Sequence, residues 1–372
     1  MRVLIVGGGV LGTMHALRAL ERGHDVVQLE REAEARGASV RNFGLIWVSG
    51  RQLGPDLEVA MRARHDWERI AADVPALGFR SNGSLTVLRT PAELAVAEDF
   101  VARPDAAERA TKLLDAAEAR ALNPALRGEM LAALWCEMDA AVESRTAQPA
   151  LRAHLAATGR YTWLSGREVR DIGEGWVRDD TAERHEADLV IVCTGAALGG
   201  LVKELRPNLP VRRVRLQMMQ TGSLDEPLLT SVADADSMRY YPGYRGPSLD
   251  ELNASQPQPE VAADNGMQLL MVQRVHGGLT IGDTHEYDEP FAFDVREDPY
   301  EHLKQRAEEL LGRPLPRIIR RWAGVYAQTE DKSQVVHREQ VLPGVWLVTG
   351  PGGRGMTGSP AIATDTWREV DA

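Results

Sequence analysis

The stretch VLIVGGGVLG, from Val3 to Gly12, decides the fold of this chain. Its first apolar residues, Val3–Val6, predict a short buried parallel strand. Gly7, Gly9 and Gly12 follow with the spacing G-x-G-x-x-G. This spacing allows a tight turn, a close approach of backbone to a pyrophosphate, and close packing of a helix on the strand. A helix is expected over about 11–22, and the N–H groups at its start favour phosphate.

A second apolar run and an acidic residue complete the pattern. Val26–Leu29 predicts the next parallel strand, and Glu30 stands at its end. A carboxylate at that place accepts hydrogen bonds from the hydroxyls of an adenosine ribose. Strand, helix, second strand and acid together predict a dinucleotide site, to which Val10, Leu11 and Arg31 are also assigned. The alternative is a glycine-rich turn in some other α/β fold.

A second glycine-rich segment, WLVTGPGGRGMTGSP, lies at the other end of the chain, from Trp346 to Pro360. A nicotinamide-dependent dehydrogenase needs the first segment and has no standard use for the second. If both segments serve one cofactor, the two ends of the chain must fold together around it, and the middle must build the substrate site.

Composition sets the broad class of protein. The chain has 372 residues, of which 44% are hydrophobic and 26% charged, as in ordinary globular proteins. Two domains are the natural expectation at this length. The net charge of −11 argues against a nucleic-acid partner. No apolar run is long enough for a membrane span, and the chain enters its first strand without a signal peptide. Cys136 and Cys193 form no disulfide framework and no metal pattern, so a cytoplasmic location without a metal site is expected.

The middle of the chain changes character along its length. Helices are expected near residues 58–73, 91–121, 146–158 and 300–311, and strands near 84–88, 188–194 and 345–349. Between about 211 and 281 the pattern is β-rich, with turns of Gly, Pro and Asn and without βαβ alternation. Dinucleotide-type elements therefore occur at the start, in the middle and at the end, and the stretches between them have antiparallel character.

The motifs resemble those of the glycine oxidase, D-amino-acid oxidase and sarcosine oxidase superfamily of FAD-dependent amine oxidoreductases. VLIVGGGVLG with Glu30 is similar to its FAD fingerprint, and GASVRNFGLI, residues 37–46, to its second FAD loop. ADLVIVCTGA, residues 187–196, is similar to its central strand, and GPGGRGMT, residues 350–357, to its C-terminal flavin loop. The order and spacing of four motifs is more specific than any one of them.

The resemblance implies an α/β fold, with a Rossmann-like FAD-binding domain and an inserted substrate domain built on a mostly antiparallel sheet. We expect the first domain from residues 1–46, 140–205 and 325–372, and the second from 47–139 and 206–324. The cofactor is expected to be non-covalent FAD, because no cysteine lies near Tyr326 or the C-terminal loop. The resemblance assigns further FAD contacts to Ala38, Ser39, Asn42, Phe43, Gly44, Val169, Thr194, Gly195, Gly352, Gly353, Arg354, Gly355, Met356 and Thr357.

The C-terminal loop also has a physical interpretation. Gly352, Gly353 and Gly355 leave it without bulky side chains, so backbone can lie against a flat ring. Met356 and Thr357 then open a helix, whose positive end would face the flavin pyrimidine. That dipole would stabilise the reduced, anionic flavin. The alternative is a glycine-rich connection to a packing helix.

One position departs from the family pattern. Amino-acid oxidases of the family carry a W-x-G-x-R motif whose arginine binds the substrate carboxylate. Here the stretch is RRWAGVYAQTED, and Tyr326 occupies the place of the arginine. A phenol cannot replace a bidentate guanidinium. Another arginine must then bind a substrate anion, or the substrate lacks an ordinary α-carboxylate. The candidates are Arg274 first, Arg239 second, and Arg41 and Arg354.

The expected reaction is oxidation of a small primary or secondary amine to an imine, by hydride transfer to flavin N5. Tyr240 and Tyr241 are expected either to line the substrate site or to pack in the core. A subgroup of the superfamily with similar loops is associated with aminophosphonate breakdown. This agrees with the absence of the arginine at position 326, because a phosphonate needs a different anion site. The acceptor is oxygen or another molecule, with Lys332 as a candidate for oxygen activation. The alternatives are an NAD-dependent dehydrogenase and a non-catalytic flavin-binding redox module. A homo-oligomer is left open.

Overall fold

The computed structural model describes the whole chain, residues 1–372. Its first sheet has six strands in the order β18-β19-β12-β1-β2-β8. The strands are β1 (Arg2–Val6), β2 (Asp25–Glu30), β8 (Tyr161–Ser165), β12 (Leu189–Val192), β18 (His337–Leu342) and β19 (Val345–Thr349). All neighbours pair in parallel except the edge strand β18, which is antiparallel to β19. Strands from the start, middle and end of the chain therefore form one Rossmann-like sheet, as the sequence predicts.

Apolar layers cover both faces of this sheet. On one face the helices are α1 (Val10–Glu21), α2 (Pro55–Asp73), α5 (Ser144–Ala156) and α11 (Gly355–Val370). They share a core of 29 buried residues with the strands, including Met14, Trp67 and Trp367. The other face packs against α6 (Leu201–Leu205) and a small sheet of β9 (Val169–Gly173), β10 (Trp176–Asp179) and β11 (Arg184–Glu186). Because both faces are covered, the central strands β1, β12 and β19 are almost entirely apolar.

The second large sheet has eight strands in the order β17-β13-β16-β15-β14-β4-β6-β5. They are β4 (Ser84–Leu88), β5 (Thr111–Asp115), β6 (Ala132–Cys136), β13 (Val211–Ser223), β14 (Ser231–Asp234), β15 (Leu270–Gln273), β16 (Gly278–Gly282) and β17 (Ile318–Thr329). Only β14 and β4 pair in parallel. This confirms the expected mostly antiparallel sheet. The helix α10 (Glu297–Leu311) packs on one face of this sheet. Its residues Tyr300, Leu303 and Leu310 are buried in the hydrophobic core between the helix and the sheet.

Two expectations about local structure are wrong. The stretch 91–121 is not one helix, because α3 (Pro91–Val101) ends early and β5 pairs along β6 before α4 (Ala116–Leu122) begins. Strand pairing in the sheet outweighs the helical propensity of this segment. The β-rich stretch 211–281 also contains α7 (Asp236–Tyr240), α8 (Pro247–Ser255) and α9 (Glu260–Asp264). These short helices cover the sheet, where Leu249 and Leu252 pack against α3 residues.

The glycines of the first motif are required by the geometry. Gly7 has φ of 110°, and a Cβ there would lie 2.3 Å from the carbonyl oxygen of Cys193. A Cβ on Gly12 would lie 2.2 Å from the carbonyl oxygen of Gly7. No side chain fits at either position. The absence of side chains lets α1 begin directly after β1 and pack closely on the sheet.

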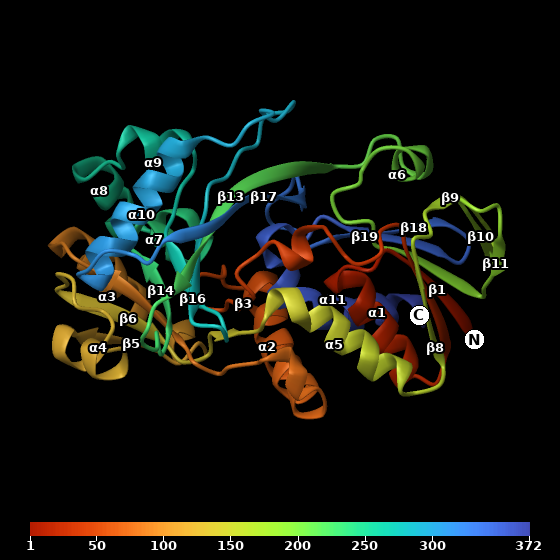
Figure 1. Cartoon of the computed structure of the whole chain (residues 1–372), viewed down its shortest axis with the longest axis horizontal. Helices are drawn as coiled ribbons and strands as arrows, with labels where there is room; N and C mark the ends of the chain where they lie inside the picture. Colours follow the sequence, from red (N-terminus) through yellow and green to blue (C-terminus); the bar gives the residue numbers. More distant parts are fainter.

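The long strands β13 and β17, at one edge of the antiparallel sheet, extend from it toward the parallel sheet (Figure 1). The parallel sheet, α1 and both chain ends lie toward one end of the molecule, and α8, α9 and α10 toward the other (Figure 1). A short pair of strands, β3 (Leu45–Ile46) and β7 (Ala140–Ala141), lies near the middle. The domain boundaries given above stay a prediction. No helix is both long and apolar enough to span a membrane.

Candidate active site

A cavity of about 1190 Å³ runs between the two sheets. Its walls come from the first glycine-rich turn, the 37–47 loop, the end of β12, the 240–242 segment, β17 and the C-terminal loop. The volume exceeds that of most pockets for small molecules, which measure roughly 300–1,000 Å³. The two glycine-rich segments from opposite ends of the chain therefore share one elongated site.

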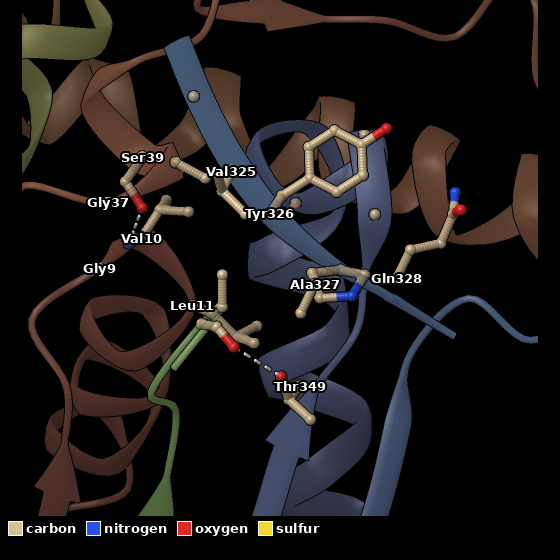
Figure 2. Close-up of a pocket in the computed structure, with 18 of the residues that line it drawn as sticks. Gly9, Val10, Leu11, Gly37, Ser39, Val325, Tyr326, Ala327, Gln328 and Thr349 are labelled. Carbon is tan, nitrogen blue, oxygen red and sulfur yellow. Dashed lines mark hydrogen bonds between the residues drawn. The ribbon is translucent and has the colours of Figure 1, made fainter. Parts of the chain in front are cut away.

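The start of α1 presents backbone N–H groups to the cavity. The helix begins at Val10, and Gly9 provides no capping side chain. The N–H of Val10 donates to Ser39 Oγ at 2.9 Å, as Figure 2 shows. The N–H of Leu11 has no acceptor in the protein. A hydroxyl oxygen thus sits where an anion's oxygen would accept, at the positive end of a helix dipole.

Glu30 organises the adjoining turn. Its Oε2 accepts from the N–H of Gly8 at 2.7 Å, and its Oε1 accepts from the N–H of Glu32 at 3.0 Å. The carboxylate is half-buried in the cavity wall. These bonds hold it at the end of β2, where the fold places the acceptor for ribose hydroxyls.

The second loop is shaped by its own side chains. Ser39 lies in η1 (Ala38–Val40), and Asn42 Nδ2 donates to the carbonyls of Ala38 at 2.8 Å and Ser39 at 3.0 Å. Asn42 Oδ1 accepts from the N–H of Gly44 at 2.6 Å. Gly44 has φ of 73°, and a Cβ there would lie 2.0 Å from a carbonyl oxygen. Asn42 and Gly44 thus position Ser39 against the start of α1.

The central strand contributes the middle of the cavity wall. Thr194 and Gly195 follow β12, and the Gly195 carbonyl accepts from Thr349 Oγ1 at 3.1 Å (Figure 2). Val169 lines the cavity from the first residue of β9. The bond between Gly195 and Thr349 joins the end of β12 to the end of β19, directly before the C-terminal loop.

The C-terminal loop is held to the rest of the site from both sides. It contains η5 (Gly352–Arg354), where Gly352 has φ of 59°, and it leads into α11 without a capping side chain. Trp67 Nε1 donates to the Met356 carbonyl at 3.0 Å. The N–H of Trp47 donates to Thr357 Oγ1 at 2.9 Å. The positive end of α11 is therefore fixed at the cavity wall.

Most of the residues expected to contact FAD line this cavity. They are Gly7, Gly9, Val10, Leu11, Glu30, Arg31, Ala38, Ser39, Asn42, Phe43, Val169, Thr194, Gly195, Gly352, Gly353, Arg354, Gly355, Met356 and Thr357. Gly12 and Gly44 lie outside its lining, and instead permit close approach of backbone. The start of α1 and the crowded glycines are compatible with a dinucleotide along this wall, and the glycine-rich C-terminal loop is compatible with a flat ring.

Two tyrosines face the C-terminal loop. Tyr240 Oη and Tyr326 Oη lie 3.5 Å apart, and a Cβ placed on Gly353 would lie 4.0 Å from each oxygen. The Tyr240 ring stacks on His285 with centroids 4.1 Å apart. Burial raises the pKa of both phenols above the usual value. Both tyrosines therefore stay protonated.

Asp283 and His285 extend this uncharged surface. Both are buried and line the cavity, and His285 Nε2 lies 3.8 Å from Asp283 Oδ2. Burial raises the pKa of the Asp283 carboxyl to about 8 and lowers the pKa of His285 to about 4. The two groups are therefore mainly neutral near pH 7.

The arginines selected from the sequence lie in different surroundings. Arg274 is outside the cavity lining, and its guanidinium donates to the carbonyls of Phe43 and Val142. Arg239 is also outside it and is bound by Asp236, Asn253 and the Gln256 carbonyl. Neither faces the cavity, so the structure gives these first two choices no support as ligands of a substrate in it.

Arg41 and Arg354 line the cavity but are engaged elsewhere. The exposed Arg41 donates to the Ala323 carbonyl at 3.0 Å. Arg354 pairs with Asp56 at 3.0 Å and donates to the carbonyls of Gln334 and Lys332. Lys332 is exposed and lies at the cavity edge.

Arg51 is the residue that the sequence analysis missed. It lines the cavity, is 5% exposed, and forms no ion pair. The only sequence signal is its place shortly after the second FAD loop, which does not distinguish it from a surface arginine.

Three groups of the kind that bind metals lie outside the cavity. Asp179, Glu183 and His185 offer ligand atoms within 4.8 Å of one another. Arg167 Nη1 donates to Asp179 Oδ2 at 2.7 Å and to Glu183 Oε2 at 3.1 Å. The guanidinium thus offsets part of the negative charge of this cluster.

Comparisons with known proteins agree with this geometry. The model of a family described as FAD dependent oxidoreductase matches residues 2–366. A D-amino-acid oxidase from Streptomyces coelicolor is 28% identical over 272 residues, which are 70% of this chain and 74% of that protein. The structure of glycine oxidase from Geobacillus kaustophilus is similar with a TM-score of 0.79 and 20% identity, over 100% of this chain and 95% of the other. L-proline dehydrogenase from P. horikoshii is similar with a TM-score of 0.80 and 18% identity, over 99% and 92%.

Proposed function

This chain belongs to the FAD-dependent oxidoreductase family, and on that premise we propose that it oxidises a small primary or secondary amine to an imine. Members of this family are FAD enzymes. The alternatives of an NAD-dependent dehydrogenase and a non-catalytic flavin-binding module are therefore not supported. The amine substrate, its binding site and the non-covalent attachment of FAD are parts of the proposal.

One observation supports an amine as the substrate. The phenols of Tyr240 and Tyr326 converge on Gly353 of the C-terminal loop, and His285 and Asp283 continue the same wall. Near pH 7 these groups are mainly uncharged, because burial disfavours their ionised forms. A wall of this kind favours an amine bound in its neutral form, which retains the lone pair that an imine requires.

When bound along the glycine-rich wall, FAD would supply the acceptor, flavin N5, for a hydride from the α-carbon of the amine. The residues of the chain need only position the substrate and exclude water, so no strong acid or base is required. Tyr326 and Tyr240 can donate or accept hydrogen bonds at the amine. The imine then hydrolyses in water. Oxygen, a quinone or a protein takes up the electrons, which makes the enzyme an oxidase or a dehydrogenase.

The substrate class follows from Tyr326. A carboxylate buried beside a phenol, without a charged partner, costs several kcal/mol. We therefore propose that glycine, sarcosine and common D-amino acids are poor substrates, and that an amine with a differently placed anion, such as a phosphonate, is a better one. Two similar proteins, a D-amino-acid oxidase and a glycine oxidase, are named for amino-acid substrates, and the proposal departs from them in the anion.

The test is an anaerobic screen of amines against the FAD-loaded enzyme, with bleaching of the flavin absorbance as the readout. Matched pairs, such as glycine and aminomethylphosphonate, separate the effect of the anion from that of the amine. We expect bleaching by aminophosphonates, with kcat/KM higher than for the amino acids. Equal or higher kcat/KM for simple amino acids contradicts the proposed anion preference, and no bleaching by any amine contradicts amine oxidation.

A further inference from the structure

We propose that Arg51 binds the oxyanion group of the amine substrate, through its two terminal amino groups. This inference rests on the proposed function, because it names the residue that holds the anionic end of that substrate. The oxyanion is a phosphonate or a carboxylate, and both are bound by the same planar fork of N–H groups.

Arg51 is a buried cation without a counter-charge. Its side chain is 5% exposed, and it is the only buried arginine among those lining the cavity. Its Nε donates to the Trp47 carbonyl at 2.9 Å. Neither Nη1 nor Nη2 donates to any protein group, and no carboxylate lies within ion-pair distance. Both terminal nitrogens are therefore free to donate to an anion bound in the cavity.

The other arginines in the cavity wall are less suited to this role. Arg354 is balanced by Asp56 at 3.0 Å, and Arg213 pairs with Glu289. Arg41 and Arg245 are exposed to solvent, where a salt bridge contributes little to binding. Arg51 therefore combines burial, free donors and a free charge in a way that the others do not.

The backbone around Arg51 is held rigidly. Asp139 Oδ1 accepts from the N–H groups of Val48 at 2.6 Å and Ser49 at 3.1 Å. Arg109, which is 1% exposed, donates to the carbonyls of Ser49 at 3.0 Å and Arg51 at 2.6 Å. A buried, fully bonded loop of this kind positions a ligand-binding side chain without a large cost in entropy on binding.

A continuous line of contacts connects Arg51 with the proposed amine site. Arg51 Cζ lies 5.9 Å from the centroid of the Tyr241 ring, and the Tyr241 and Tyr240 rings are 5.0 Å apart. Tyr240 Oη is in turn 3.5 Å from Tyr326 Oη. Arg51 and the two phenols are therefore joined by one continuous row of side chains in the cavity wall.

The test measures binding of two anions that carry no amine, methylphosphonate and acetate, to FAD-loaded enzyme by isothermal titration calorimetry. The variants are Arg51→Gln, which removes the charge, Arg51→Lys, which keeps the charge but not the fork, and Arg69→Gln as the control. Arg69 lies on α2 with its side chain 61% exposed. The flavin content of each variant verifies that it folds.

We expect the wild type to bind at least one anion, and the tighter one identifies the group. Arg51→Gln should weaken its binding by roughly tenfold to a hundredfold, with a smaller loss in Arg51→Lys and none in Arg69→Gln. Unchanged affinity in Arg51→Gln overturns the proposal, as does a wild type that binds neither anion. If Arg51→Gln does not retain flavin, the loss in Arg51→Lys decides. Because the probes contain no amine, anion binding at Arg51 without amine oxidation would contradict the proposed function alone.

Discussion

Tyr240 Oη and Tyr326 Oη lie 3.5 Å apart although the residues are 86 positions apart in the chain. One comes from the end of the short helix α7 and the other from the long strand β17. Through this contact α7, which packs on the antiparallel sheet, meets β17, the strand that leads toward the C-terminal loop. The side of the cavity facing Gly353 is therefore made of two protonated phenols.

We predict that Tyr326→Phe weakens substrate binding without unfolding the protein. The hydroxyl has one weak protein partner, so its removal should lower the free energy of unfolding by at most about 1 kcal/mol. Loss of one hydrogen bond to the amine should raise KM by roughly twofold to tenfold. Steady-state kinetics with the best amine measure this. Tyr300→Phe is the control, because Tyr300 Oη bonds to the Trp322 carbonyl outside the cavity. An unchanged KM in Tyr326→Phe would remove Tyr326 from the proposed site.

Gly9→Val should abolish most FAD binding. The Cβ alone would lie 3.0 Å from Ser39 Oγ, and the branched side chain would occupy the space at the start of α1 that a pyrophosphate needs. The ratio of flavin to protein after purification is the measurement. Gly222→Ala is a matched control, because a Cβ there has only an ordinary contact at 3.8 Å. Full FAD content in a folded Gly9→Val protein would show that phosphate does not bind there.

The flavin should leave the protein on denaturation. Both cysteines are buried and neither belongs to the C-terminal loop; Cys193 lines the cavity at the end of the central strand, and Cys136 lies outside it. Burial also raises the pKa of both thiols, which keeps them protonated and unreactive. Precipitation with acid should therefore put all of the FAD into the supernatant. Flavin that remains in the precipitate would indicate a covalent bond.

Asp283 should make stability depend on pH. Burial raises the pKa of its carboxyl from 3.8 to about 8 in the folded state. Between about pH 4 and pH 8 the unfolded chain loses this proton while the folded protein keeps it, so the stability that Asp283 contributes falls as pH rises. The Asn side chain of the Asp283→Asn variant does not titrate. The difference in Tm between this variant and the wild type should therefore rise from about pH 4 to about pH 8 and stay constant at higher pH.

Thermal unfolding of the FAD-loaded proteins at several pH values measures this difference. The exposed Asp264→Asn is the control, and its Tm should follow the wild type at every pH. Parallel profiles for Asp283→Asn and the wild type would mean that the Asp283 carboxyl ionises with an ordinary pKa.

The sequence by itself determined the dinucleotide-binding framework. The strand Arg2–Val6, the helix that follows and Glu30 were predictable because glycine spacing and apolar runs act over short distances. The same holds for Val345–Thr349 and the helix after it. The order of these segments along the chain sufficed to predict a parallel sheet with an antiparallel insertion.

Only the tertiary structure decided the state of individual side chains. Thr111–Asp115 became a strand because β6 offered it an edge, which no local pattern records. The sequence does not distinguish the roles of Arg274 and Arg51. In the structure the guanidinium of Arg274 donates to two backbone carbonyls, whereas the terminal nitrogens of Arg51 have no protein partner. Asp283 holds its proton because the fold removes it from water. Partners and burial depend on residues far along the chain, and these are brought together only by folding.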